Sequence, residues 1–238
     1  MIGDLSRRAI HERELMDDPD ADLDMLERTY RRFAIVNAVV SRRRRVYRRE
    51  IRPRVARNSP VRVLDIGSGG ADMARAIVHW AHRDGASVDV TALDLDPRAV
   101  SWARANDTGD AVHHRCASSS ALADAGEKFD VVLSNHLLHH LDETDRAALL
   151  ADSERLVAPG GVALHCDIER SRLAYASYDL GTALFARTVL AGSFIRADGL
   201  TSIRRSYTAA ELVAVAPPGW HVERTFPARL ALRHEQPA

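Results

Sequence analysis

The sequence predicts a doubly wound α/β fold, in which helices cover both faces of a mostly parallel β-sheet. Two observations carry this prediction. From Val61 onward, short apolar runs alternate with segments of helical spacing, as in parallel βαβ units. The run from Val131 to Leu133 is apolar at every position, as expected for a strand that is buried on both faces. The length of 238 residues allows one such domain with room for an appendage.

The predicted strands are short apolar runs that end at turn residues. The first run ends in a glycine turn, and the second ends at Asp94. The tail reads as two strands joined at Phe226-Pro227. The strands expected before the tail are 61–66, 88–93, 111–116, 129–133 and 162–168.

The predicted helices lie between these strands. Residues 71–81 have helical spacing of their apolar positions, and Pro97 suits the first turn of a helix through residue 105. A third helix covers 147–157 and is stopped by Pro159-Gly160-Gly161.

Two segments with amphipathic helical stripes, 1–57 and 171–205, lie outside this alternation. We therefore divide the chain into a helical N-terminal segment, 1–57, and a core, 58–238, that contains an inserted helical segment at 171–205.

Composition excludes several classes of protein. The 33 basic residues balance 33 acidic ones, which argues against nucleic acid as a partner. No stretch approaches the ~18 apolar residues of a membrane span, and the N-terminus lacks the pattern of a signal peptide. Cys116 and Cys166 fall in predicted strands without metal-ligand spacing, so we expect buried thiols and no metal site. These features predict a cytoplasmic protein without stable membrane insertion.

The glycine turn after the first strand carries the strongest functional signal. Gly67 and Gly69 allow a tight reversal and close approach of a ligand to the backbone. Asp65, two residues before Gly67, is placed to receive an ammonium group. Asp94, at the end of the next strand, is placed to receive both hydroxyls of a ribose. An amino acid joined to a nucleoside fits this set, and S-adenosylmethionine is such a molecule.

The main alternative is a nucleotide-sugar or NAD-dependent oxidoreductase. The dinucleotide pattern has Gly or Ala where this chain has Asp72, whose carboxylate would repel a pyrophosphate. The common short-chain type also needs a Tyr-x-x-x-Lys pair, which Lys128, the sole lysine, does not supply.

Four stretches within residues 61–168 support the first interpretation: VLDIGSG at 63–69, ALDLDP at 92–97, FDVVLSN with LHHL at 129–141, and LVAPGG at 156–161. Together they resemble the motifs of the class I S-adenosylmethionine-dependent methyltransferases. The resemblance implies a seven-stranded sheet with an antiparallel last strand, and helices outside the core that cover the substrate. Two departures stand out: Ala71 replaces a frequent third glycine, and residues 116–120 lack the usual acid that holds adenine.

The resemblance also implies which residues hold the cofactor. Ser118 or a backbone carbonyl would replace the missing acid. The expected set is Asp65, Gly67, Ser68, Gly69, Asp72, Asp94, Leu95, Ala117, Ser118 and Asn135.

Catalysis is expected beyond the carboxyl ends of the strands. A hydroxyl acceptor must lose a proton, and a histidine suits that role. His136, directly after the fourth strand, is the first candidate base, and His139 and His140 are alternatives that can also serve packing. His165 lies inside a predicted strand and is expected to be a core residue.

An apolar pocket between the helical segments is expected to hold the methyl acceptor. The acceptor is predicted to be a small apolar or aromatic molecule (phenolic, quinol or lipid-like) methylated on oxygen by a monomer or homodimer. Methylation of carbon or nitrogen, or a non-catalytic partner subunit of the same fold, stays open. The candidate substrate residues are Tyr30, Phe33, Asp167, Arg170, Tyr175 and Tyr178.

Overall fold

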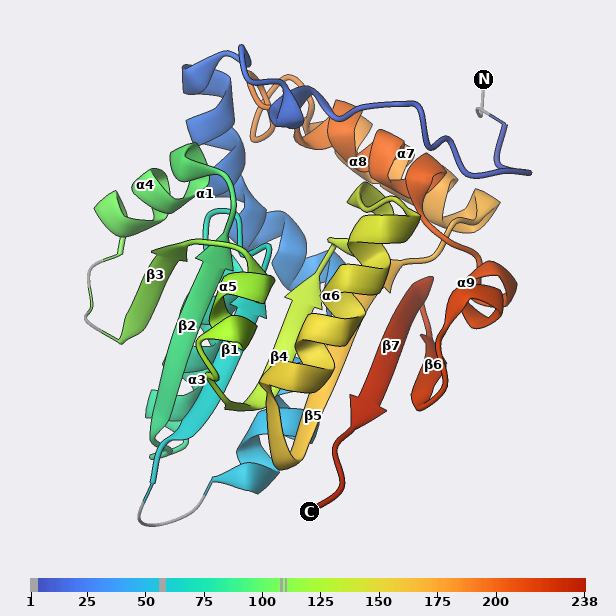
Figure 1. The fold of residues 1–238 in the computed structure, drawn as a ribbon. Coiled ribbons are helices and arrows are strands. Elements are labelled where there is room, and N and C mark those ends of the chain that lie inside the picture. The colour runs from blue at the N-terminus through green and yellow to red at the C-terminus, as the bar shows by residue number, and fades with distance from the viewer. Residues whose placement is uncertain (1–3, 56–58, 108, 110) are drawn as a thin grey trace.

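The computed structural model describes residues 4–55, 59–107, 109 and 111–238. Its centre is a seven-stranded sheet in the order β3-β2-β1-β4-β5-β7-β6 (Figure 1). Among the strands described, β7 alone runs opposite to the other six, so the predicted fold class is confirmed. The strands are β1 (Val61–Ile66), β2 (Val88–Asp94), β3 (Val112–Cys116), β4 (Phe129–Asn135), β5 (Val157–Ile168), β6 (Trp220–Thr225) and β7 (Arg229–Glu235).

Helices cover both faces of this sheet. The α-helices are α1 (Leu23–Val40), α2 (Arg43–Val46), α3 (Asp72–Arg83), α4 (Pro97–Ala105), α5 (Ser119–Asp124), α6 (Glu143–Leu156), α7 (Arg172–Phe185), α8 (Ile195–Arg205) and α9 (Ala209–Val215). Shorter helical turns are η1 (Leu15–Asp17), η2 (Tyr47–Ile51), η3 (Arg52–Arg54) and η4 (Leu138–His140).

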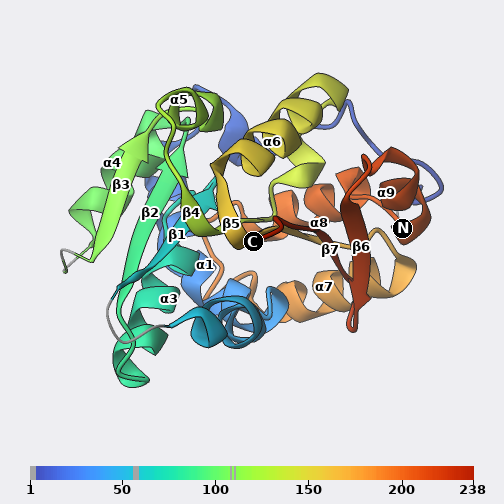
Figure 2. The same ribbon diagram turned by 60° about the horizontal axis from the view of Figure 1, so that its bottom comes forward.

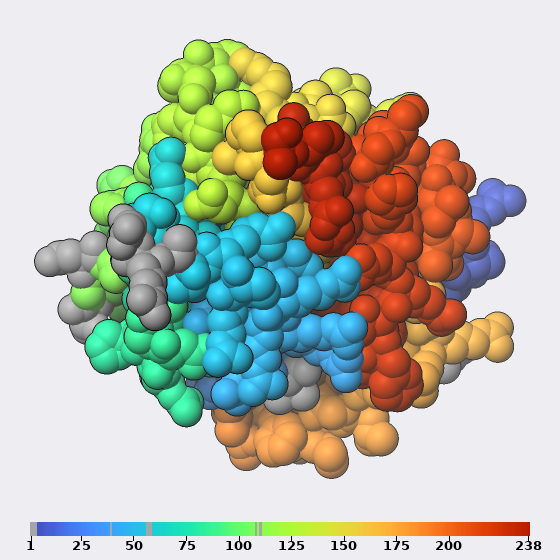
Figure 3. Space-filling view, turned by 90° about the horizontal axis from the view of Figure 1, so that it is seen from below, coloured from blue at the N-terminus to red at the C-terminus, as the bar shows by residue number. Residues whose placement is uncertain are grey.

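Two apolar cores join the helices to the sheet. On one face, side chains from α5, α6 and α9 pack on β1, β4 and β7. On the other face, η2, α3 and α4 pack on β1, β2 and β4. Figure 2 shows α6 and α3 on opposite faces of the sheet. At the amino ends of the parallel strands, the segment containing η2 and η3 lies beside the C-terminal hairpin (Figure 3), where Arg49 Nη2 donates to Glu223 Oε1 at 2.7 Å.

The boundary between α6 and β5 differs from the prediction. The helix ends at Leu156, and pairing with β4 begins at once, at Val157. The register then moves from Phe129↔Val157 to Val131↔Val162, so Pro159-Gly160-Gly161 form a bulge inside a longer strand.

The expectation of two buried thiols was also wrong, because Cys116 is exposed and Cys166 is partly buried; both are free.

η1 and α1 of the N-terminal segment lie together with α7 and α8 of the inserted segment over the carboxyl ends of the parallel strands (Figure 1). Leu26 and Tyr30 of α1 pack against Trp102 of α4 and Phe194. The N-terminal segment runs across α8, where Asp198 accepts the amides of Leu15 and Met16 at 2.8 and 3.1 Å. This arrangement closes one side of the site described next.

Candidate active site

A cavity of about 630 Å³ lies at the carboxyl ends of β1, β2 and β4. Its volume is typical of pockets that bind small molecules. The strand order reverses between β1 and β4, and open α/β sheets bind ligands at such a reversal. Strand ends and loops of the core form its floor, and α1, η1, α7 and α8 contribute its walls.

The glycine turn opens directly onto this cavity. Gly67 and Gly69 adopt φ values of 67° and 51°, in the left-handed region that favours glycine. A Cβ added to Gly69 would meet nothing within 4 Å among the described atoms, so it would project into the cavity. Ala71 also has a positive φ, 57°, at the place where the sequence departs from the expected third glycine.

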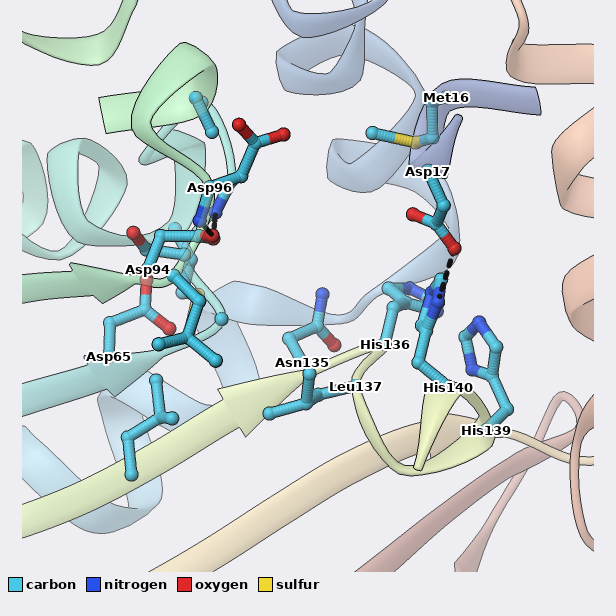
Figure 4. Close-up of a pocket in the computed structure, with 18 of the residues that line it drawn as sticks. Met16, Asp17, Asp65, Asp94, Asp96, Asn135, His136, Leu137, His139 and His140 are labelled. Atoms are coloured by element: carbon cyan, nitrogen blue, oxygen red, sulfur yellow. Dashed lines mark hydrogen bonds and ion pairs between the residues drawn. The ribbon is translucent and has the colours of Figure 1, made fainter. Parts of the chain in front are cut away.

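Asp65 is buried at the end of β1 and faces the cavity (Figure 4). Burial and the nearby Asp72 and Asp94 carboxylates raise its pKa well above the usual range. Its Oδ2 has no hydrogen-bond partner in the described part of the chain. An unpaired buried carboxylate oxygen is costly, and a ligand ammonium group would satisfy it.

Asp94 is held at the end of β2 by two backbone amides. Its Oδ2 accepts from Gly69 N–H at 2.7 Å, and its Oδ1 accepts from Asp96 N–H at 2.9 Å (Figure 4). Each carboxylate oxygen can accept a further hydrogen bond, so both remain available to a diol in the cavity. Burial raises the pKa of this carboxyl, although the two amides oppose that effect.

Asp72, at the start of α3, is engaged by the N-terminal segment. Arg43 Nη1 forms a close ion pair with its Oδ2, and Asn37 Nδ2 donates to the same oxygen at 3.2 Å. Arg43 also donates to Ala34 O at 2.8 Å and thereby fixes the end of α1. Arg43 could not be singled out from the sequence, because the arginine-rich run 42–45 does not reveal which guanidinium turns inward.

The loop after β3 lines the cavity with Ala117 and Ser118, and Leu95 lies beside it with an exposed side chain. Ser118 Oγ accepts from Ala121 N–H at 3.2 Å and caps α5. Ser119 and Ser120 both donate to Oδ2 of Asp152, at 2.7 Å each. Asp152 therefore brings a carboxylate from α6 to the loop whose sequence lacks one.

His136 follows β4 directly and lines the cavity with Asn135. Its Nε2 lies 2.9 Å from Ser41 Oγ and 3.1 Å from Arg229 Nη1. Arg229 also donates to Asn135 Oδ1 at 2.7 Å. Burial and the Arg229 guanidinium lower the pKa of His136 well below its usual value, so the ring is neutral at neutral pH.

His139 has a different environment. Its Nδ1 lies 2.9 Å from Asp167 Oδ1, and its Nε2 lies 3.2 Å from Glu14 Oε1. Burial alone would lower the pKa of His139, but the two carboxylates outweigh it and raise the pKa to about 9. The ring then carries both protons at neutral pH and is not free to accept another, which disfavours a role as base. The His140 ring lies beside it at an angle of 37°, with ring centroids 4.3 Å apart (Figure 4).

The predicted substrate residues divide into two groups. Tyr30, Phe33 and Tyr178 line the cavity. The other three, Asp167, Arg170 and Tyr175, do not line the cavity. Asp167 is used by His139, and Arg170 is buried and bonds Glu211 Oε1 at 2.6 Å and Ser206 O at 2.7 Å.

Tyr175 is the third of these corrections. It packs against Leu200 and Ile203, between α7 and α8, because its helix turns that face toward its neighbour. His165, in contrast, is a core histidine as predicted: it is fully buried between Ser134 Oγ at 2.8 Å and Ser153 Oγ at 3.1 Å.

None of the helices among the described residues is both long and apolar enough to cross a membrane. A family model described as a methyltransferase domain matches residues 39–207. The chain is 32% identical over 152 residues to a ubiquinone biosynthesis O-methyltransferase of Cereibacter sphaeroides, over 61% of this chain and 58% of the relative. A protein of the same name from Brucella ovis is 31% identical over 56% of this chain and 51% of its own length. The chain thus spans little more than half the length of these relatives.

Solved structures resemble the fold throughout most of the chain. The plantazolicin methyltransferase BpumL, solved with SAH, gives a TM-score of 0.57 at 14% identity and covers 94% of this chain and 93% of its own. Human N-acetylserotonin methyltransferase, solved with SAM, gives 0.61 at 13% identity, over 91% of this chain and 57% of its own. At these identities the likeness shows a shared fold.

Proposed function

The chain belongs to the methyltransferase-domain family, and we propose that it is an S-adenosylmethionine-dependent methyltransferase that methylates oxygen on a small apolar or aromatic molecule. The observation that carries this proposal is the arrangement of Asp65, Gly69 and Asp94 around one cavity. Asp65 offers an unpaired buried carboxylate oxygen to the ammonium group of the cofactor. Gly69 leaves room for close approach, and Asp94 keeps acceptor capacity for the ribose hydroxyls.

The cofactor, when bound, supplies an electrophilic methyl group. The residues of the chain have to position the acceptor oxygen in line with it and exclude water, because positioning provides much of the rate of a displacement. Tyr30, Phe33 and Tyr178 provide an apolar wall from α1 and α7 for that purpose. The O-methyltransferase relatives support an oxygen acceptor of this kind.

His136 is our candidate for the group that removes the acceptor proton. It lines the cavity directly after β4, and its depressed pKa keeps the imidazole neutral, as a base requires. His139 is less suitable because both of its ring nitrogens face carboxylates. Methylation of carbon or nitrogen, or a non-catalytic partner role, are the competing outcomes. Cytoplasmic location, independence of nucleic acid and a monomeric or homodimeric state stay predictions.

The test is a screen with methyl-labelled cofactor against phenols, quinols and hydroxylated lipids, with product masses determined. We expect transfer of one methyl group to oxygen. His136→Ala should lower turnover by about 10²–10⁴-fold with cofactor affinity nearly unchanged. His221→Ala, an exposed histidine on β6, is the matched control and should retain full turnover. Normal turnover of His136→Ala would rule out this base, and a product methylated on carbon or nitrogen would rule out the proposed acceptor.

A further inference from the structure

Three side chains from distant parts of the chain converge on one wall of the cavity. Glu14 lies just before η1, and His139 and His140 lie in η4. Glu14 Oε1 is 3.2 Å from His139 Nε2 and 3.5 Å from His140 Nε2. These three atoms all lie within 4.8 Å of one another, so a single small ion could touch all of them.

The other ring nitrogen of each histidine, Nδ1, already contacts a carboxylate. His139 Nδ1 lies 2.9 Å from Asp167 Oδ1, and His140 Nδ1 lies 3.0 Å from Asp17 Oδ2. Figure 4 shows the contact between Asp17 and His140. A carboxylate on one ring nitrogen is the usual arrangement of a metal-binding histidine, because it fixes the ring and leaves the other nitrogen for the ion. Both histidines have this arrangement, and both direct Nε2 toward Glu14.

The spacing agrees with a tetrahedral ion. Ligand atoms 2.0–2.1 Å from such an ion lie about 3.3 Å from each other. The two measured distances from Glu14 Oε1, 3.2 and 3.5 Å, fall on either side of that value. Glu14 is itself fixed, since Ser202 Oγ donates to its Oε1 at 2.6 Å. Asp198 holds the adjacent Leu15 amide, so the carboxylate needs little movement to bind an ion.

Charge also favours a cation at this point. Glu14, Asp17 and Asp167 contribute three carboxylates around two imidazole rings. Arg205, which contacts η4, donates to the carbonyls of His139 and His140 rather than to these carboxylates. A divalent ion would replace the proton that His139 Nε2 shares with Glu14.

We propose that Glu14, His139 and His140 bind a divalent transition-metal ion such as Zn²⁺ on the wall of the cavity, with at least one coordination position facing the cavity. Two imidazoles and one carboxylate suit Zn²⁺ or a neighbouring transition metal, whereas Mg²⁺ and Ca²⁺ prefer oxygen ligands. The proposal that the ion binds does not depend on the proposed methyltransferase activity. Its role, to hold and acidify the acceptor hydroxyl, rests on the proposed function.

This site could not be predicted from the sequence, because Glu14 and His139 are 125 residues apart. Two adjacent histidines after a strand do not by themselves indicate a metal site. The third ligand, Glu14, comes close to them only because the N-terminal segment crosses the ends of the strands.

The experiment is calorimetric titration of the full chain, stripped of metal by chelation, with Zn²⁺ and separately with Mg²⁺, without cofactor or acceptor. We expect one Zn²⁺ per chain and at least tenfold weaker binding of Mg²⁺. His140→Ala and Glu14→Gln should each weaken Zn²⁺ binding at least tenfold, and Asp17→Asn should weaken it about tenfold by releasing the His140 ring. His140 and Asp17 are partly exposed, so these two variants test the site even if Glu14→Gln fails to fold.

His113→Ala is the matched control, because exposed His113 also faces one carboxylate, Asp89, at 3.3 Å. It should bind Zn²⁺ like the unaltered chain. Absence of stoichiometric Zn²⁺ binding, or equal binding by His140→Ala, Asp17→Asn and the unaltered chain, would overturn the site. The triad would then be an ion-pair cluster that fastens the N-terminal segment. A chain that binds Zn²⁺ but transfers no methyl group would contradict the proposed function and leave the metal site intact.

Discussion

Three carboxylates that line the cavity, Asp65, Asp72 and Asp94, have different partners. Asp72 is neutralised by Arg43, and Asp94 accepts two backbone amides. Asp65 keeps one oxygen without a partner among the described residues, and the other two carboxylates further raise its pKa. Burying that group costs free energy in the free protein. A bound ammonium group would recover this cost, which makes Asp65 a source of cofactor affinity rather than of fold stability.

The contribution of the glycine turn to cofactor binding can be separated from the effect of its backbone conformation on stability. Gly69→Ala and Gly85→Ala place a Cβ on residues with similar positive φ, 51° and 66°, and neither Cβ would meet a described atom within 4 Å. Each substitution should cost about 1 kcal/mol of unfolding free energy through its backbone conformation. Gly69 faces the cavity, so only Gly69→Ala should weaken cofactor binding, by about tenfold or more.

Urea unfolding and calorimetry measure the two effects separately. Equal cofactor affinity of the two variants would mean that the turn does not approach the ligand.

At the scale of elements, the site depends on segments that come from outside the βαβ core. α2 is joined to α3 through Arg43 and Asp72, and η1 is joined to α8 through Asp198. Leu26 and Tyr30 of α1 add a small apolar cluster to these polar joints, whereas the sheet is held by larger apolar cores on both of its faces. The walls of the cavity are therefore easier to open than its floor.

Removal of one joint should expose the N-terminal segment without unfolding the core. Asp198→Ala leaves the amides of Leu15 and Met16 without their acceptor, at a cost of about 1–3 kcal/mol. We expect tryptic cleavage within residues 7–13 to become about tenfold faster, as measured by the mass of the shortened chain.

Asp179→Ala is the control, because Asp179 pairs with Arg196 at the surface of α7 and α8. Unchanged cleavage of Asp198→Ala would show that other contacts hold the segment.

At the scale of the whole molecule, the sequence predicted what depends on local pattern. β1 and α4 begin and end where periodicity, glycine and proline placed them, and Asp65, Gly69 and Asp94 meet at one cavity because parallel strands end at one edge. The contacts it did not predict join distant segments: Arg43 with Asp72, Arg229 with His136 and Glu14 with His139. No periodicity marks such a partner, because its position follows from how helices pack on the sheet. The same reason explains why Arg170 and Tyr175 were wrongly expected at the cavity.

Binding of S-adenosylmethionine in this cavity can be measured by calorimetry with S-adenosylmethionine, its demethylated product and NAD. We predict saturable binding of the first two and much weaker binding of NAD. Asp94→Ala should lose roughly 1–3 kcal/mol of cofactor affinity, because a charged acceptor is removed from a largely buried position. Asp89→Ala, on the same strand but outside the cavity lining, should bind normally. NAD binding as tight as that of S-adenosylmethionine, or full affinity in Asp94→Ala, would contradict the account.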